Sequence, residues 1–208
     1  MDAPRITPRI AVGLGSGRCG THSLAMLLGQ QPFADVKHER KPALCWSVAD
    51  ETDPLRHIRK PTRGAELYGD VGFYYLPHVR TIWNELPDVR FVCLKRDKAE
   101  TVASFMRYLP RDMSVLQDGR GQPSSWDVSF PSYPDEWTKE QAFGAYWEAY
   151  YALADELAAD NPDRFRVFPT EALNTKAGVM DILRFVGVRD PRPTVGLKMC
   201  VTQRRTAA

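Results

Sequence analysis

The sequence lacks several features that would place it in a broad class at once. No apolar stretch approaches the roughly 20 residues that a membrane-spanning helix needs, and residues 1–5 do not read as a signal peptide. Neither charge sign dominates, because 28 Lys and Arg face 26 Asp and Glu, leaving a net charge of +2. A surface this neutral argues against a protein that coats nucleic acid or anionic membrane, so any bound anion has to be gripped locally.

Cysteine and histidine are sparse and scattered. The four cysteines, at positions 19, 45, 93 and 200, are too far apart for a CxxC motif and do not look like a disulfide framework in 208 residues. His57 and His78 have no partner at metal-ligand spacing. We therefore expect reduced thiols, a cytoplasmic location and no metal site.

What is present is the composition of a globular protein, with 43% hydrophobic and 26% charged residues, and we expect one domain over 1–208. Apolar periodicity predicts alternating strands and helices. The predicted strands cover 9–14, 34–37, 67–71, 90–95 and 165–168, and the predicted helices begin near 21, 77, 97, 138 and 175. This alternation implies an α/β fold in three layers, with a mostly parallel central sheet and helices on both faces.

Residues 109–137 interrupt this pattern with Pro, Gly, Ser and Asp, which predicts a variable, irregular excursion. Its aromatic residues, Trp126, Phe130, Tyr133 and Trp137, are candidates for the wall of an acceptor pocket or for a lid. A satellite hydrophobic cluster explains them equally well.

A glycine-rich loop, Gly15 to Ser23, stands where the first predicted strand gives way to a helix. Backbone N–H groups and the helix dipole converge there, which favours a bound anion, although a loop that only turns the chain remains an alternative. The loop begins like a Walker A motif, but Thr21 replaces the lysine and His22 replaces the magnesium-binding hydroxyl residue. Arg18 instead supplies a forked cation within the loop.

Cys19 lies beside the start of this helix, a setting that can activate a thiol. A cysteine phosphatase would need an arginine six positions later, and Ala25 stands there. We do not expect Cys19 to act as a nucleophile.

A second strand-to-helix junction follows the strand at 90–95. Arg96 comes directly after this strand, and Ser104 lies eight positions later on the next helix. Because ligands bind at the carboxyl ends of parallel strands, this pair is a candidate second anion site near the glycine loop.

Together these motifs resemble the sulfotransferases that use 3′-phosphoadenosine 5′-phosphosulfate (PAPS). Arg18 to Ser23 is similar to the family's 5′-phosphosulfate loop, with Cys19 in place of the usual hydroxyl residue, and Lys95 to Asp97 with Ser104 is similar to its 3′-phosphate motif. Residues 167–173 and 185–188 resemble its closing strand, turn and helix.

The resemblance implies a P-loop-like fold, PAPS as sulfuryl donor, the bisphosphate PAP as product, and no metal. The residues implied in binding the donor are Arg18, Cys19, Gly20, Thr21, His22, Ser23, Arg96 and Ser104. Arg18, with neighbouring N–H groups, would also stabilise the leaving 5′-phosphate.

The stretch 18–39 is most similar to tyrosylprotein sulfotransferases and related bacterial enzymes, in which a glutamate at this position is the catalytic base. The resemblance therefore points to Glu39 as the residue that accepts the proton of a hydroxyl acceptor. His38 is a rival, although strand alternation would point it to the other face, and Asp70 at the end of the third strand is another.

Two basic segments stay open. Residues 56–63 suit either a solvated surface or a grip on an acidic ligand, and Arg204 with Arg205 suits either a frayed tail or a cover over the 3′-phosphate. The predicted function is sulfuryl transfer from PAPS to a sugar, phenol, lipid or peptide hydroxyl, without a nucleic-acid partner or membrane span. A P-loop kinase and a non-catalytic bisphosphate-binding module are the alternatives, and the sequence does not decide the oligomeric state.

Overall fold

The structure, a computed structural model, describes residues 8–48, 53–108, 129–134 and 136–194. Its strands are β1 (Arg9–Leu14), β2 (Ala34–His38), β3 (Leu67–Val71), β4 (Arg90–Lys95) and β5 (Phe165–Pro169). Its helices are α1 (Thr21–Gly29), α2 (Val79–Glu85), α3 (Lys98–Tyr108), α4 (Lys139–Asp160) and α5 (Lys176–Phe185), with short 3-10 helices η1 (Phe73–His78) and η3 (Thr170–Asn174). The predicted strand at each of the five places is confirmed.

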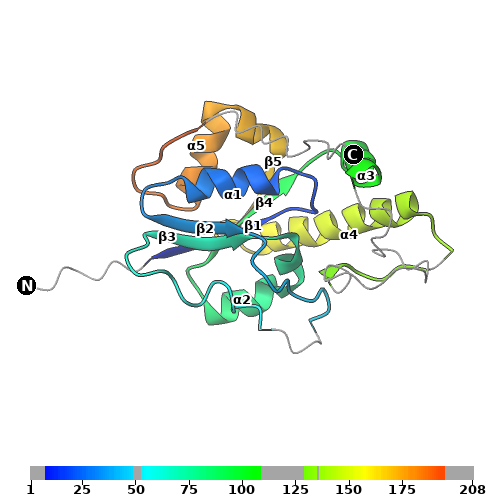
Figure 1. The fold of residues 1–208 in the computed structure, drawn as a ribbon, viewed down its shortest axis with the longest axis horizontal. Helices are drawn as coiled ribbons and strands as arrows, with labels where there is room; N and C mark the ends of the chain where they lie inside the picture. Colours follow the sequence, from blue (N-terminus) through cyan, green and yellow to red (C-terminus); the bar gives the residue numbers. More distant parts are fainter. Residues whose placement is uncertain (1–7, 49–52, 109–128, 135, 195–208) are drawn as a thin grey trace, which may run out of the picture.

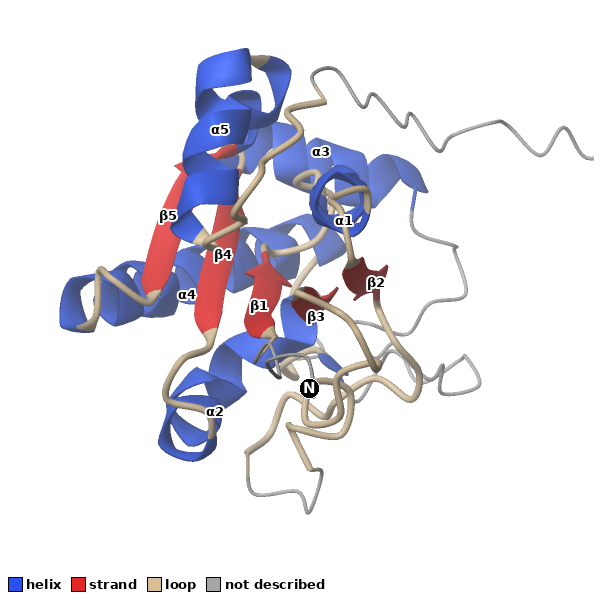
Figure 2. Ribbon diagram, turned by 90° about the vertical axis from the view of Figure 1, so that its left-hand side faces the viewer, coloured by secondary structure: helices blue, strands red, loops and turns tan. Residues whose placement is uncertain are grey.

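The five strands form one sheet in the order β2-β3-β1-β4-β5, and every neighbouring pair is parallel (Figure 2). Helices α1 and α5 cover one face, and α2 and α4 cover the other (Figure 1). Successive strand residues serve opposite faces, so that Ala11 packs with α1 and α5, whereas Val12 packs with the aromatic side chains of α4. The predicted three-layer α/β fold is confirmed.

This strand order has one topological switch point, between β1 and β4. The chain leaves β1 toward β2 on one side and leaves β4 toward β5 on the other, although β1 and β4 are neighbours. In parallel sheets, ligands bind outside the carboxyl ends of two such strands. The two predicted anion-binding junctions follow β1 and β4, so the topology itself brings them together.

Local signals set the helix ends as expected. Thr138 and Gln141 form the capping box that begins α4, and the Thr175 hydroxyl accepts the Gly178 N–H at the start of α5. Gly187, with a φ of 78°, follows the end of α5 in the left-handed conformation that glycine adopts easily.

Two local expectations are wrong. The pattern places Pro77 as the first residue of the helix that begins near 77, but Pro77 lies inside the 3-10 helix η1, and α2 starts only at Val79. Asp97 and Glu100 have the spacing of a capping box for the helix that begins near 97. Asp97 accepts the Glu100 N–H at 2.9 Å, but the Glu100 carboxylate accepts from Arg96 and does not complete the box.

Part of the excursion at 109–137 falls within the described residues. Phe130 and Tyr133 pack against the core on the α4 side, and the Tyr133 and Trp137 rings stack at 5.7 Å. These contacts favour the hydrophobic-cluster interpretation, while Trp126 lies outside the described residues. Within the described part of the chain, no helix combines the length and apolarity needed to cross a membrane.

Candidate active site

The loop between β1 and α1 is built from backbone conformations that few residues tolerate. Gly15, Gly17 and Gly20 have φ values of 151°, 86° and 95°, and Arg18 has a φ of 55°. A Cβ on Gly15 would lie 2.3 Å from the Sγ of Cys19, so the loop closes too tightly for any side chain at this position. Arg18 occupies the left-handed region without being glycine, a strained conformation that is typical of functional sites.

Two tyrosine hydroxyls of helix α4 bind this loop. The Gly15 N–H donates to the hydroxyl of Tyr150 at 3.0 Å, and the Ser16 N–H donates to the hydroxyl of Tyr151 at 3.4 Å. Tyr151 in turn donates to the carbonyl of Leu94 at 2.7 Å, so one buried hydroxyl ties the loop to the end of β4. In the sequence, Tyr150 belongs to an apolar stripe at helical spacing and Tyr151 has no distinguishing feature, so neither residue is predicted to have this role.

The two predicted anion-binding junctions meet. Arg18 donates its Nε–H to the hydroxyl of Ser104 at 3.2 Å, and Arg96 donates from a terminal nitrogen to the carbonyl of Arg18 at 3.1 Å. The carbonyl of Arg96 accepts the indole N–H of Trp147 at 3.1 Å, which anchors the end of β4 to α4. Two guanidinium groups therefore stand at one edge of the sheet, beside the first turn of α1.

Arg96 carries a second partner that the sequence did not reveal. Its Nε and a terminal nitrogen both lie 2.9 Å from the same carboxylate oxygen of Glu100. About a third of the Arg96 side chain and well over half of the Glu100 side chain are exposed, so this ion pair faces solvent.

The predicted base, Glu39, follows β2 directly and has a φ of 53°. Its N–H donates to the carbonyl of Val71 at 2.9 Å, which keeps the residue beside the end of β3. Burial raises the pKa of its carboxyl to about 7, the Asp70 charge adds to this, and the positive charges of Lys41 and Arg18 oppose it. A carboxyl with this pKa can exchange a proton near neutral pH.

Asp70, the second carboxylate candidate, is fully buried and surrounded by donors. It accepts the hydroxyls of Tyr74 and Tyr75 at 3.1 and 3.0 Å and the Arg40 N–H at 3.2 Å. Burial raises its pKa despite these bonds. With its oxygen atoms engaged inside the protein, Asp70 is suited to holding the residue after Glu39 in place rather than to meeting a substrate.

His38 lies closer to Glu39 than strand alternation predicted. Glu39 turns into the left-handed region after the strand, and this brings the His38 Nδ1 within 3.8 Å of a Glu39 carboxylate oxygen. The other nitrogen of His38 lies 3.2 Å from the Thr21 hydroxyl, and its ring meets that of His22 edge to face. Burial lowers the pKa of His38 to about 4, so the ring is neutral at neutral pH.

Cys19 and Gly20 are the remaining loop residues before helix α1. Cys19 is fully buried, and burial raises the pKa of its thiol to about 11, which agrees with its expected lack of nucleophilic chemistry. Its carbonyl accepts the Thr170 hydroxyl at 2.8 Å, so neither the thiol nor the carbonyl of Cys19 is placed to contact a ligand. Gly20 caps α1, whose first turn includes Thr21, His22 and Ser23, and first-turn N–H groups have no partner within a helix.

Two other basic segments of the sequence are candidates for contacts with a ligand. The basic run at 56–63 is mostly exposed, and Arg59 pairs with Asp53 at 3.0 Å, as expected of a solvated surface. Arg204 and Arg205 lie outside the described residues. Among the residues that the structure describes, no group of three or more His, Cys, Asp or Glu side chains is placed to hold a metal.

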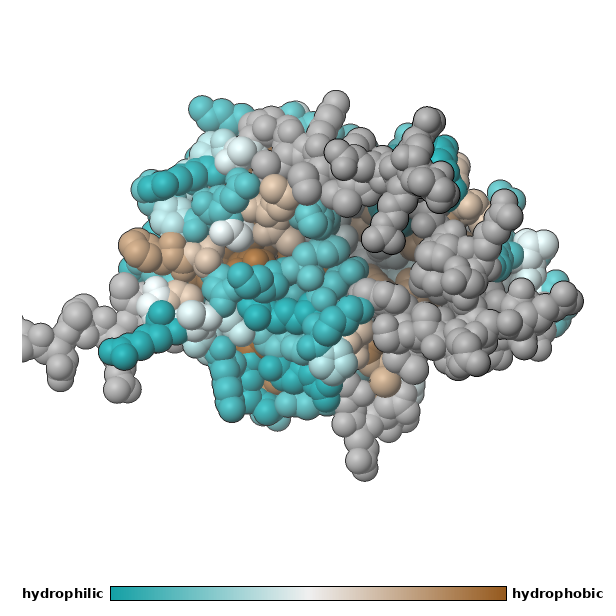
Figure 3. Space-filling view, in the orientation of Figure 1, coloured by the Kyte–Doolittle hydropathy of each residue, from teal (hydrophilic) through white to brown (hydrophobic). Residues whose placement is uncertain are grey.

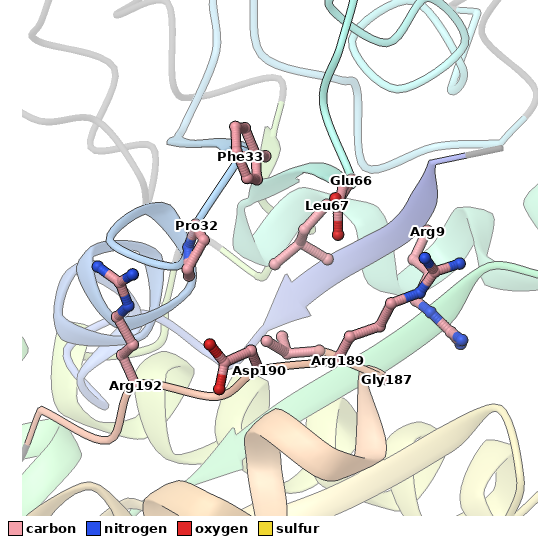
Figure 4. Close-up of a pocket in the computed structure, with 10 residues that line it drawn as sticks. Arg9, Pro32, Phe33, Glu66, Leu67, Gly187, Arg189, Asp190 and Arg192 are labelled. Atoms are coloured by element: carbon pink, nitrogen blue, oxygen red, sulfur yellow. The ribbon is translucent and has the colours of Figure 1, made fainter. Parts of the chain in front are cut away.

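A cavity of about 230 Å³ opens at the opposite edge of the sheet (Figure 4). It is lined by residues at the starts of β1 and β3 and by the segment after α5, including Arg9, Leu67 and Asp190. The described part of the face seen in Figure 3 is largely hydrophilic, with only small apolar patches. Neither feature adds a residue to the cluster around Arg18.

Comparisons with known proteins agree with the fold. No protein-family model and no curated protein matches the chain. Among solved structures, the crystal structure of a sulfotransferase from Alicyclobacillus acidocaldarius matches with a TM-score of 0.59 and 16% sequence identity, covering 93% of this chain and 87% of that one. The chain has the fold of that protein. At this identity the likeness extends to the arrangement of the elements and not to individual site residues.

Proposed function

We propose that the protein is a PAPS-dependent sulfotransferase that moves a sulfuryl group to a hydroxyl acceptor. The observation that carries the proposal is the meeting of Arg18, Arg96 and Ser104 at the switch point of the sheet, with Glu39 on the same edge. Two anion-binding junctions suit a nucleotide that bears phosphates at both its 3′ and 5′ positions. The fold shared with a sulfotransferase structure supports this assignment.

In this proposal the loop after β1 binds the 5′ end of the donor. Arg18 and the N–H groups of the first turn of α1 face the 5′-phosphate and stabilise the negative charge that it gains on leaving. Lysine at the Walker position is replaced by Thr21, so the positive charge comes from within the loop. Arg96 and Ser104 bind the 3′-phosphate and orient the donor.

Glu39 acts as the general base. The acceptor oxygen forms a bond to the donor sulfur while the bond from sulfur to the 5′-phosphate oxygen breaks, and its electron pair stays with the bisphosphate product. The acceptor proton passes to the Glu39 carboxylate. A pKa of about 7 lets this group be ionised before the step and protonated after it. His38 is neutral and hydrogen-bonded to the Thr21 hydroxyl, and its ring lies between the loop and the base.

The test is calorimetric titration of the wild type and of Arg96→Ala with adenosine 3′,5′-bisphosphate and, separately, with Mg-ATP. We expect the wild type to bind the bisphosphate with micromolar affinity without metal, and Arg96→Ala to lose most of that affinity. A preference for Mg-ATP, or indifference to Arg96, would overturn the proposal. Arg80→Ala serves as the control, because Arg80 is an exposed arginine whose ion-pair partners, Glu156 and Asp160, are not residues of the proposed site.

A further inference from the structure

Glu100 occupies the edge of Arg96 that a phosphate would use. Guanidinium groups bind phosphate best side by side, through two parallel N–H bonds. In this structure the Nε and one terminal nitrogen of Arg96 converge on one Glu100 oxygen, each at 2.9 Å, while the other terminal nitrogen binds the Arg18 carbonyl. A 3′-phosphate therefore cannot use the Nε edge of Arg96 until the carboxylate has moved away.

We propose that Glu100 competes with the 3′-phosphate for Arg96, which lowers the affinity for 3′-phosphorylated nucleotides and speeds release of the bisphosphate product. This inference rests on the proposed function. The displaced carboxylate stays close because Glu100 lies on the first turn of α3, only four residues from Arg96. Its negative charge then repels a bound phosphate, and the cost falls only on ligands that carry phosphate at the 3′ position.

Glu100 is not needed to keep Arg96 in place. The Arg18 carbonyl holds the end of the guanidinium group, and Trp147 holds the Arg96 carbonyl. The Glu100 carboxylate is exposed and has no other partner among the described residues. The backbone N–H of Glu100 donates to the Asp97 carboxylate, and this bond does not depend on the Glu100 side chain. Removing the carboxylate charge thus leaves both the helix start and the arginine anchored.

The alternative role makes the opposite prediction. If Glu100 served to position Arg96, its removal would weaken binding of the bisphosphate. If it competes with the phosphate, its removal strengthens binding. The sign of one affinity change therefore separates the two roles.

The experiment measures the affinities of adenosine 3′,5′-bisphosphate and adenosine 5′-phosphate for the wild type, Glu100→Gln and Glu156→Gln. We expect Glu100→Gln to bind the bisphosphate about tenfold more tightly and to release it more slowly, with the monophosphate unchanged within about twofold. Glu156→Gln removes an equally exposed, ion-paired carboxylate elsewhere and should change neither affinity.

Unchanged or weaker binding of the bisphosphate to Glu100→Gln would overturn the inference, and so would an equal gain for both nucleotides. A wild type that does not prefer the bisphosphate to the monophosphate would instead overturn the proposed function, on which the inference depends. Thermal unfolding of each variant verifies that the substitution has not altered the fold.

Discussion

The two strand-to-helix junctions of the site are held by different kinds of contact. After β1, the loop is closed by three glycines with positive φ and fastened to α4 by buried hydroxyl groups of Tyr150 and Tyr151. After β4, the side chain that would bind a ligand is fastened only by one hydrogen bond to the Arg18 carbonyl, and its remaining edge pairs with the exposed carboxylate of Glu100. Buried hydrogen bonds are costly to break, whereas an exposed ion pair contributes about 0–1 kcal/mol.

This difference teaches that one site can combine a rigid half, the loop after β1, with an exchangeable half, in which Arg96 can change its partner. In the proposed reaction, a rigid loop suits the place where charge develops, because donors that are already in position need no reorganisation. An exchangeable arginine suits the place that only holds the donor and must let the product go. The rigid half would then govern turnover, and the exchangeable half would govern affinity.

The largest expected effect is a division between the two arginines. We expect Arg18→Ala to lower kcat by about 10²- to 10³-fold, because its charge is needed most when the 5′-phosphate leaves. We expect Arg96→Ala to raise the KM for PAPS at least tenfold with a much smaller effect on kcat. Steady-state kinetics with an acceptor found by screening phenols, sugars and hydroxyl-bearing peptides would measure both. Equal effects of the two substitutions on kcat would remove the distinction between the junctions.

The pH dependence gives a smaller effect that sharpens the comparison. As the proposed general base, Glu39 accepts a proton only when ionised, so kcat/KM should fall about tenfold per pH unit below a pKa of about 7. The charge of Arg18 lowers the pKa of Glu39, so Arg18→Ala should move this acid limb to higher pH.

Arg96→Ala should leave the acid limb in place, since Arg96 is not among the groups that shift the pKa of Glu39. In Glu39→Gln the limb should disappear together with most of the turnover. An acid limb that persists in Glu39→Gln would assign it to another group.

The smallest expected effect concerns the fastening of the rigid loop. Tyr151→Phe removes a hydroxyl that accepts the Ser16 N–H and donates to the Leu94 carbonyl, and we expect a loss of about 1–3 kcal/mol in the free energy of unfolding. Tyr146→Phe on the same helix is the matched control, because the Tyr146 hydroxyl is buried without a hydrogen-bond partner among the described residues. Urea unfolding of both variants would measure the difference, and equal stability would contradict a special role for Tyr151.

Much of the fold follows from local sequence patterns. The β-branched run at 9–14 and the apolar run at 90–95 have the bounds that periodicity indicated, since each is buried on both faces of a parallel sheet. Pro77 lies in a 3-10 helix and not at the start of an α-helix, because a proline suits both positions. Periodicity alone does not separate those two conformations.

The site was only partly predictable from the sequence. The glycine loop and Arg96 stand out because their spacing and their places after strands are local features. Strand alternation predicts that His38 and Glu39 point to opposite faces. That expectation requires the strand to continue, and Glu39 leaves it with a positive φ. The role of Tyr151 could not be predicted for a different reason. Its hydrogen-bond partners lie far along the chain, and its spacing on the helix matches that of an ordinary core residue.

The bond between Gly15 and Tyr150 also bears on how the protein folds. It joins residues that lie 135 positions apart, so the loop after β1 cannot be fastened until α4 has been made and docked. Contacts between such distant residues form slowly, because closing a long loop costs conformational entropy. We therefore expect the loop after β1 to reach its final conformation only after α4 has docked, because a nascent chain that ends before α4 lacks the Tyr150 and Tyr151 hydroxyls that fasten this loop.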